Sequence, residues 1–288
     1  MAVNIGAILT AMVTPFDADG RVDEEATVRV MHHLVDTGSD GLVVCGTTGE
    51  ASTLTDEEQL DVIGLAVGEM KGRCKIVAGV GSNDTRHAVH LTERATELGP
   101  DALLSVTPYY NRPNRRGIIR HYEEVTGATD LPILLYNIPS RTAVDLPNDL
   151  LAELAQLDNI FGVKQANADN LAKVDGLQIY AGNDDLLADV LDLGEPGGVL
   201  TCTHVFGREM RRMVDEPEHR REIDDAMQDV YRDMSIAPLA CSNKAALNLL
   251  GLQVGAPRLP YVELDEDEIA IVRGLLERHG MLETARAG

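Results

Sequence analysis

The sequence predicts a (β/α)8 barrel of the α/β class, also called a TIM barrel, with a C-terminal helical extension. Eight short apolar runs recur along the chain, and a helix-like segment follows nearly every one of them. Runs that are apolar on both faces are typical of strands buried in a parallel sheet. A doubly wound sheet would usually carry a glycine-rich phosphate turn after its first strand, and the segment VTPFDADG is not such a turn.

The predicted strands fill the first two thirds of the chain. They are AILTAMV, GLVVCG, KIVAGV, ALLSV, PILLY, IFGVK, LQIYAG and GGVLT, beginning at Ala7, Gly41, Lys75, Ala102, Pro132, Ile160, Leu177 and Gly197. Six helix starts are predicted between them, at Asp23, Thr55, Asp84, Asn114, Pro147 and Asp184. The signal at Thr55 is the most specific, because T-D-E-E fits a capping box in which Glu58 reaches back to the backbone.

The pattern changes after about Phe206, where strands stop and helical segments continue. These segments are REMRRMVDE, EIDDAMQDVYRDM, NKAALNLLG and EDEIAIVRGLLER. We therefore expect residues 1–205 to form the catalytic barrel core and residues 206–288 to form a helical extension packed on it. No low-complexity linker separates the two parts, so they can be counted as one domain.

Charge and cysteine usage restrict the partners and the compartment. The 288 residues carry a formal net charge of −22, which repels nucleic-acid phosphates and anionic lipid, so we expect neither as a partner. The four cysteines contain no C-x-x-C pair, which favours reduced, buried thiols. No signal peptide begins the chain, and no apolar run approaches the roughly 20 residues that span a bilayer. We therefore expect a cytoplasmic protein.

Active sites of such barrels lie at the carboxyl ends of the strands, so the motifs there are the candidates. After five of the predicted strands the chain carries hydroxyls, a lysine, an arginine and turn glycines. These motifs are GTTGE at 46–50, TPYYNRP at 107–113, YNIPSRT at 136–142, GVKQAN at 162–167 and AGNDD at 181–185.

Lys164 is the candidate nucleophile. It is one of only five lysines, and the others, Lys71, Lys75, Lys173 and Lys244, do not fall at the mouth end of a predicted strand. Partial desolvation there disfavours the ammonium form and leaves a neutral amine that can attack a ketone to give a Schiff base. The alternative is a structural lysine whose ammonium pairs with a carboxylate at the barrel rim.

An imine mechanism also needs proton transfer, which phenols and hydroxyls can supply. Tyr136, Thr47 and Tyr110 are candidates for a chain of such groups. Taken singly, each has an ordinary structural explanation: a tyrosine at a barrel end is usually a core residue, and T-T-G is usually a turn.

Two features favour a substrate with carboxylates. Backbone N–H groups of Thr47, Thr48 and Gly49, just before a helix, form a concavity suited to a carboxylate, which indicates a 2-keto acid. Arg141 could bind a second carboxylate in a bidentate manner. The alternative for Arg141 is a surface ion pair, which is common in so acidic a protein.

The motifs G-T-T-G-E, P-Y-Y-N-R-P, Y-N-I-P-S-R-T and G-V-K, in this order, resemble those of the dihydrodipicolinate synthase and N-acetylneuraminate lyase superfamily. Within it the chain is most similar to the dihydrodipicolinate synthases. The resemblance extends from TPFD at Thr14 to the segment G-x-P-R-L-P that ends at Pro260.

This resemblance implies a class I aldolase step without a metal or an organic cofactor. Lys164 would form the imine with pyruvate, and Thr47 and Thr48 would hold the pyruvate carboxylate. Tyr136 would be the proton shuttle. Thr47 would link it to Tyr110, which in the family enters the site from a neighbouring subunit.

The resemblance also implies the second substrate. The enamine would attack L-aspartate 4-semialdehyde, with its carboxylate on Arg141, and ring closure would give 4-hydroxy-tetrahydrodipicolinate for lysine and diaminopimelate biosynthesis. Gly182 and the backbone of Leu200 occupy positions that orient the lysine or line the pocket. Two departures are Gln165, where many members carry Glu, and the segment GEPGGVL, one residue longer than usual before Leu200.

The family further implies a homotetramer of tight dimers, with Tyr109 and Tyr110 at a subunit contact. In lysine-sensitive members an allosteric cleft uses histidines, an acid, an asparagine and the first tyrosine of the pair. This chain keeps Asn83 and Tyr109, but has Asp56 and Gln59 in place of the histidines and His87 in place of the acid. We therefore expect L-lysine to act weakly, although Asp56 could supply a substitute carboxylate.

Three alternatives stay open at this point. The first is another pyruvate-dependent lyase, acting on N-acetylneuraminate or a 2-keto-3-deoxy sugar acid, but Arg141 suits a short substrate with its own carboxylate better than a polyol. The second is a non-catalytic barrel that binds a ligand. The third is a metal-dependent aldolase, for which only His87 and His90 have a suitable spacing, on the surface of one helix.

Overall fold

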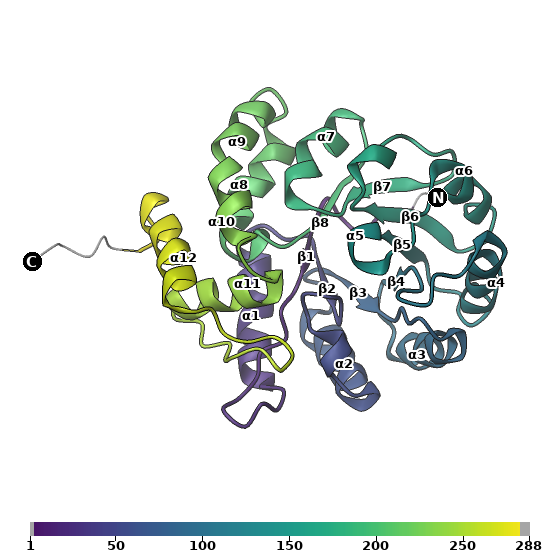
Figure 1. The fold of residues 1–288 in the computed structure, drawn as a ribbon, viewed down its shortest axis with the longest axis horizontal. Helices are drawn as coiled ribbons and strands as arrows, with labels where there is room; N and C mark the ends of the chain where they lie inside the picture. Colours follow the sequence, from purple (N-terminus) through teal and green to yellow (C-terminus); the bar gives the residue numbers. More distant parts are fainter. Residues whose placement is uncertain (1–2, 283–288) are drawn as a thin grey trace, which may run out of the picture.

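The computed structural model describes residues 3–282, and at its centre eight parallel strands close into a barrel in sequence order (Figure 1). All eight predicted runs form strands, so the predicted fold class is confirmed. The strands are β1 (Ile8–Ala11), β2 (Gly41–Val44), β3 (Lys75–Gly79), β4 (Ala102–Val106), β5 (Ile133–Asn137), β6 (Ile160–Gln165), β7 (Gln178–Ala181) and β8 (Gly197–Leu200).

Helices surround the barrel, and most begin where their capping residues predict. Asp23, Asp84 and Asn114 each accept a hydrogen bond from a backbone N–H of the following helix, and Thr55 and Glu58 form the predicted capping box. The helices of the ring are α1 (Glu24–Asp36), α2 (Asp56–Met70), α3 (Thr85–Leu98), α4 (Arg115–Thr126), α5 (Pro139–Thr142), α6 (Asn148–Leu154), α7 (Leu187–Asp192) and α8 (Thr203–Asp215).

Asp184 begins a helical turn as predicted, but its side chain does not cap it. The turn is the short 3-10 helix η3 (Asp184–Leu186), which runs into α7. The carboxylate instead accepts hydrogen bonds from the backbone N–H groups of Thr201 (2.9 Å) and Cys202 (2.8 Å), and from the Thr201 hydroxyl (2.7 Å). Asp184 therefore ties the end of β7 to the end of β8.

Side chains from alternate strand positions fill the barrel interior. The set is mainly apolar and includes Leu9, Ala11, Val43, Val77, Leu104, Leu134, Tyr136 and Val199. The register pairs Tyr136 of β5 with Lys164 of β6, so these two side chains occupy the same level of the interior. The opposite face of the strands packs against the surrounding helices.

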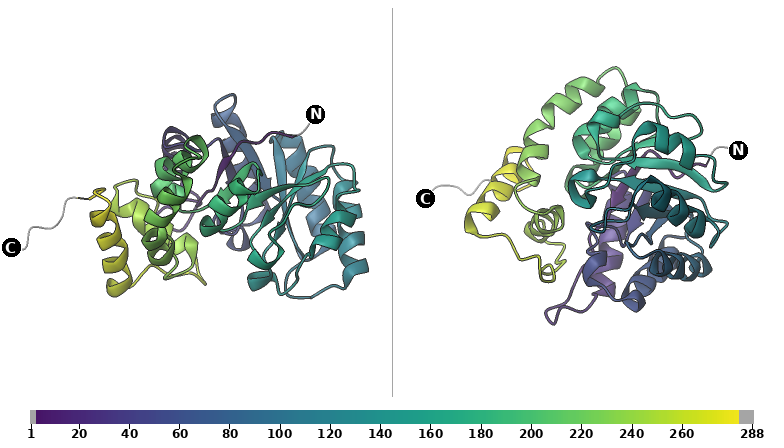
Figure 2. Two further views of the ribbon diagram at one scale, coloured as in Figure 1. Left: turned by 90° about the horizontal axis from the view of Figure 1, so that it is seen from above. Right: turned by 45° about the vertical axis from the view of Figure 1, so that its right-hand side comes forward.

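The C-terminal helices lie on one side of the barrel (Figure 2). They are α9 (Arg220–Ala226), α10 (Gln228–Met234), α11 (Leu239–Leu249) and α12 (Glu266–Arg278), and they share an apolar cluster with α8. The division at 205/206 falls inside α8, which has a non-helical residue at Phe206 and packs on β1 and α1. The part of α8 beyond the boundary thus belongs to the helical ring of the barrel as well as to the extension.

Over residues 3–282, none of the helices combines the length and the apolar character that crossing a membrane requires. All four cysteines have free thiols, and Cys45, Cys202 and Cys241 are buried. Burial raises the pKa of the Cys45 thiol to about 12, which keeps it protonated and unreactive.

Candidate active site

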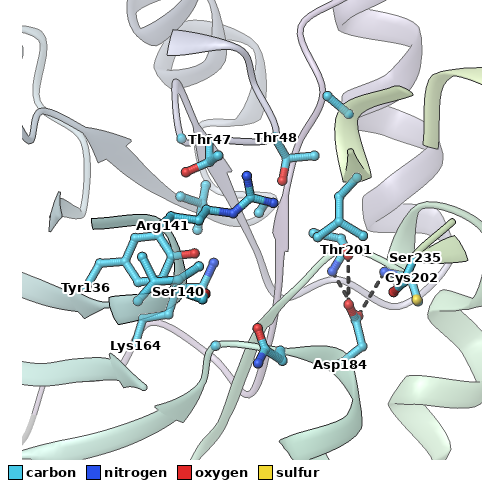
Figure 3. Close-up of a pocket in the computed structure, with 18 of the residues that line it drawn as sticks. Thr47, Thr48, Tyr136, Ser140, Arg141, Lys164, Asp184, Thr201, Cys202 and Ser235 are labelled. Carbon is cyan, nitrogen blue, oxygen red and sulfur yellow. Dashed lines mark hydrogen bonds between the residues drawn. The ribbon is translucent and has the colours of Figure 1, made fainter. Parts of the chain in front are cut away.

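A cavity of about 320 Å³ opens at the carboxyl ends of the strands. Six of the eight predicted catalytic and substrate-binding residues line it: Thr47, Thr48, Tyr136, Arg141, Lys164 and Gly182. Figure 3 shows the two threonines and the arginine on one side of the cavity, and Asp184 with its Thr201 and Cys202 contacts on the other. The motifs at the ends of β2, β5, β6 and β7 therefore meet at one place.

Lys164 lies deep in this cavity. Only 5% of its surface is exposed, and its Nζ lies 4.2 Å from the centroid of the Tyr136 ring. Burial lowers the pKa of Lys164 to about 8; the nearby negative charge of Asp184 opposes this shift and the positive charge of Arg141 adds to it. The structural-lysine alternative requires a carboxylate partner. Within residues 3–282, no carboxylate oxygen lies within 4.0 Å of the Lys164 Nζ. The amine is therefore neutral in a large fraction of molecules near pH 8.

Tyr136 presents a protonated phenol to the same cavity. Burial raises the pKa of its hydroxyl to about 12, against a smaller opposing effect of the Arg141 charge. The hydroxyl therefore holds its proton at neutral pH and can donate it. No hydrogen bond joins Tyr136 to Thr47 in the described part of the chain, so the proposed relay is not closed within one chain.

Tyr110 lies outside the cavity of its own chain. Its side chain is 89% exposed, its backbone is left-handed (φ 71°), and its N–H donates to the carbonyl of Thr142 at 3.3 Å. Tyr109 beside it is also partly exposed. The structure thus does not bring Tyr110 together with Tyr136 and Thr47 within a single chain.

Arg141 projects into the cavity from the short helix α5. Among residues 3–282 no carboxylate oxygen lies within 4.0 Å of its guanidinium, so the surface ion pair considered above is not present there. The guanidinium is thus available to a ligand carboxylate.

Gly182 and Leu200 contribute differently. A Cβ at Gly182 would lie 2.7 Å from the backbone N of Ala166, so only glycine fits this close approach of β7 to β6. Leu200 is buried in the cluster beneath the outer helices, together with Ile8 and Leu187. The next two residues, Thr201 and Cys202, line the cavity where Leu200 does not.

Gln165, the position at which many family members carry Glu, has partners away from the cavity. Its Oε1 accepts hydrogen bonds from Asn137 Nδ2 and from the backbone N–H of Asn167, each at 3.0 Å. The Asn137 amide also donates to Asp145 at 2.9 Å. Side chains alternate along a strand, so Gln165 faces outward when Lys164 faces inward. The departure thus changes a supporting network and leaves the cavity lining unchanged.

Sequence reasoning missed the part of the lining that comes from β7, β8 and the extension. These residues include Asn183, Asp184, Asp185, Thr201, Cys202, Tyr231, Ser235, Leu239, Ala240 and Tyr261. The motif AGNDD was noted, but no local pattern placed Tyr231 or Tyr261 near the barrel mouth. Tyr231 donates its hydroxyl to Asp224 at 3.0 Å, which fixes its ring at the cavity wall.

A second cavity of about 410 Å³ adjoins the first and shares Thr47, Tyr136 and Arg141 with it. Four of the five allosteric candidates line it, namely Asp56, Gln59, His87 and Tyr109. The fifth, Asn83, donates its amide to the carbonyl of Tyr109 at 3.2 Å. His87 Nε2 lies 2.9 Å from Asp56 Oδ1, so the carboxylate that could replace the missing acid is already engaged.

Comparison with known proteins agrees with this geometry. The Dihydrodipicolinate synthetase family matches residues 4–279. A 4-hydroxy-tetrahydrodipicolinate synthase of Desulforudis audaxviator is 38% identical over 294 residues, which cover 98% of this chain and 100% of the relative. The crystal structure of a dihydrodipicolinate synthase from Bacillus anthracis superimposes with a TM-score of 0.91 at 34% identity, over 99% of this chain and 100% of that one.

A second solved structure resembles the chain equally well. The chloride-inhibited dihydrodipicolinate synthase of Acinetobacter baumannii, complexed with pyruvate, has a TM-score of 0.93 at 32% identity over 97% of this chain and 100% of that one. The chain therefore belongs to the Dihydrodipicolinate synthetase family, as a lyase of the 4-hydroxy-tetrahydrodipicolinate synthase type.

Proposed function

We propose that this chain condenses pyruvate with L-aspartate 4-semialdehyde through a Schiff base on Lys164, giving 4-hydroxy-tetrahydrodipicolinate. The observation that carries the proposal is the buried Lys164 amine, with its lowered pKa, beside the Tyr136 ring in a cavity that the Arg141 side chain also lines. The Acinetobacter baumannii relative, whose structure contains pyruvate, supports the choice of the first substrate. The route uses neither a metal ion nor an organic cofactor.

The first half of the reaction forms the imine. The neutral amine of Lys164 attacks the carbonyl carbon of pyruvate, and the resulting hydroxyl leaves as water after it takes a proton from Tyr136. The carboxylate of pyruvate binds at the turn that carries Thr47 and Thr48, where backbone N–H groups and hydroxyls can donate to it. Transfer of a methyl proton back to the Tyr136 oxygen then converts the imine into a nucleophilic enamine.

The second half builds the ring. The enamine carbon attacks the aldehyde carbon of the semialdehyde, whose carboxylate is held by Arg141, and the aldehyde oxygen takes up a proton to become the 4-hydroxyl. The amino group of the semialdehyde then attacks the imine carbon and displaces the amine of Lys164. The cycle forms one carbon–carbon bond and one carbon–nitrogen bond, releases one water, and regenerates the lysine.

Arg141 is expected to serve the second substrate far more than the first. Replacing it with alanine removes a charge-assisted bidentate pair worth about 1.5 to 3 kcal/mol, so kcat/KM for the semialdehyde should fall by roughly 10- to 150-fold. The concentration of pyruvate that half-saturates borohydride trapping should change less. Arg141→Lys keeps the positive charge but loses the bidentate geometry of the guanidinium. Its kcat/KM for the semialdehyde should lie between those of the wild type and Arg141→Ala. Equal losses for both substrates would indicate a structural role.

We also propose that L-lysine inhibits this enzyme weakly. An ammonium group brought into the second cavity would find the Asp56 carboxylate already paired with His87, and desolvating a charge without a partner costs several kcal/mol. Turnover measured against lysine concentration tests this. Half-inhibition below about a millimolar, roughly 4 kcal/mol of binding, would contradict it.

The assembly is proposed to be a homotetramer of tight dimers in the cytoplasm. The support is Tyr110, which is exposed and outside its own cavity, and is therefore free to complete the hydroxyl relay of a neighbouring subunit. Analytical ultracentrifugation combined with an activity assay tests this arrangement: a fully active monomer would exclude a contribution of Tyr110 in trans.

A further inference from the structure

A second lysine is buried near the mouth of the barrel, and it comes from the extension. Lys244 of α11 is 1% exposed, and its Nζ lies 2.6 Å from Oε1 of Glu50, which is fully buried. Neither residue lines the 320 Å³ cavity. Taking two charges out of water is costly, so such a pair is a poor source of stability and calls for another explanation.

Glu50 ends the turn that carries Thr47 and Thr48. It has a left-handed backbone (φ 55°), and so does Cys45 (φ 54°) at the start of the turn. This conformation is disfavoured for residues with a Cβ, and it persists only where surrounding contacts impose it. The turn between the two residues therefore depends on interactions at its ends.

The contacts at the Glu50 end come from the extension. Its Oε2 accepts the backbone N–H of Arg258 at 2.8 Å, while Lys244 donates to the carbonyl of Ala256 at 3.2 Å. Both cations also contact the ring of Phe16, with Lys244 Nζ 4.0 Å and Arg258 Cζ 4.3 Å from its centroid. Glu50 is thus fixed by groups that lie about 200 residues further along the chain.

Arg258 makes further contacts with the segment that follows Glu50. Its guanidinium donates to the Glu58 carboxylate at 2.5 and 2.8 Å and to the carbonyl of Thr53 at 2.9 Å. Glu58 in turn completes the capping box that begins α2. The segment from Glu50 to the first turn of α2 is therefore held on one side by the extension and on the other by its own helix.

We infer that Glu50 and Lys244 are positioning residues, through which the C-terminal extension fixes the turn that binds the substrate carboxylate. The inference rests on the proposed function, which assigns the Thr47 and Thr48 turn to the carboxylate of pyruvate. The pair itself touches no substrate. Its loss allows the turn to relax and misaligns the donors at Thr47 and Thr48, while the amine of Lys164 stays in place on β6.

The decisive comparison uses two ketones that differ in a carboxylate, pyruvate and hydroxyacetone, both trapped on the enzyme with borohydride. The double variant Glu50→Gln/Lys244→Met removes both charges, so no unpaired charge is buried. We expect its half-saturating concentration to rise about tenfold for pyruvate and less than about twofold for hydroxyacetone. A disturbance of the whole barrel would raise both values alike.

A matched control and two further variants complete the test. Lys75→Met removes the exposed pair between Lys75 and Asp101 (2.7 Å) and should leave both ketones unaffected. The isosteric Glu50→Gln should reproduce the selective loss of pyruvate binding. Lys244→Arg, which retains the positive charge, should keep most of the pyruvate binding of the wild-type protein. If the double variant does not fold, Glu50→Gln alone decides the question, because the positioning role predicts a selective loss of pyruvate binding in this variant.

The outcomes separate this inference from the proposed function. Equal shifts for the two ketones, or no shift for pyruvate, would overturn the positioning role alone. Failure of the wild-type protein to form any adduct on Lys164 would overturn the proposed function, and this inference with it.

Discussion

Turnover is expected to fall by about 10⁴-fold or more when Lys164 is replaced with alanine, because the residue forms the covalent bond on which every later step depends. Steady-state assays with both substrates measure the loss. Lys173→Ala is the matched control, since it removes an exposed lysine beyond β6 and should leave turnover unchanged. Substantial turnover in Lys164→Ala would place the nucleophile elsewhere.

The lowered pKa of Lys164 adds a pH signature to this expectation. Only the neutral amine attacks the ketone, and its fraction grows as pH rises toward the pKa of about 8. The rate of imine formation in a single turnover should therefore increase up to about pH 8 and level off above it. A lysine with an ordinary pKa of about 10.4 would continue to gain rate well beyond pH 9.

Tyr136→Phe should lower turnover by about 10²-fold or more, the usual effect of removing a positioned acid or base. The change deletes one hydroxyl and keeps the ring that lies 4.2 Å from Lys164 Nζ, so pyruvate binding should change much less. Because burial holds the pKa of this phenol near 12, the hydroxyl carries its proton at neutral pH and its loss removes a donor.

Tyr180→Phe provides the matched control for Tyr136→Phe. Tyr180 is also buried in the barrel interior, but its hydroxyl donates to Gln178 Oε1 at 3.2 Å and it does not line the cavity. The control should retain near-normal turnover. Comparable losses in the two variants would assign the effect to packing, and near-normal turnover in Tyr136→Phe would remove this residue from the mechanism.

The sequence predicted the barrel well because its signals are local. Buried parallel strands are short apolar runs, and helix starts carry their own capping residues, as Thr55 with Glu58 illustrates. The barrel then brings strand ends together whatever their distance along the chain, which is why Thr47, Tyr136 and Lys164 could be placed in one site.

The features that escaped prediction depend on contacts between distant segments. Asp184 looks like a helix-capping residue, yet it binds the backbone after β8. Lys244 lies in an ordinary helical pattern, and only the packing of α11 against the β2 turn brings it to Glu50. The Tyr231 and Tyr261 side chains reach the cavity in the same way. Periodicity and capping carry no information on how such elements dock.

Two of the candidate site residues, Tyr110 and Leu200, do not line the cavity of their own chain. The resemblance predicts that Tyr110 of the motif TPYYNRP completes the site of a neighbouring subunit, and within its own chain this side chain is exposed and lies outside the cavity. For the run GGVLT the resemblance assigns the backbone of Leu200 to the site. The Leu200 side chain is buried beneath the outer helices, and Thr201 beside it lines the cavity.

The most direct test of the account is the mass of the intact protein after reduction with borohydride in the presence of pyruvate, followed by mapping of the tryptic peptides. We predict one carboxyethyl group per chain, located on Lys164 and absent when pyruvate is omitted. An adduct on Lys173 or Lys244, or a protein that keeps its unmodified mass under saturating pyruvate, would contradict the proposal that the chemistry of this barrel proceeds through the amine of Lys164.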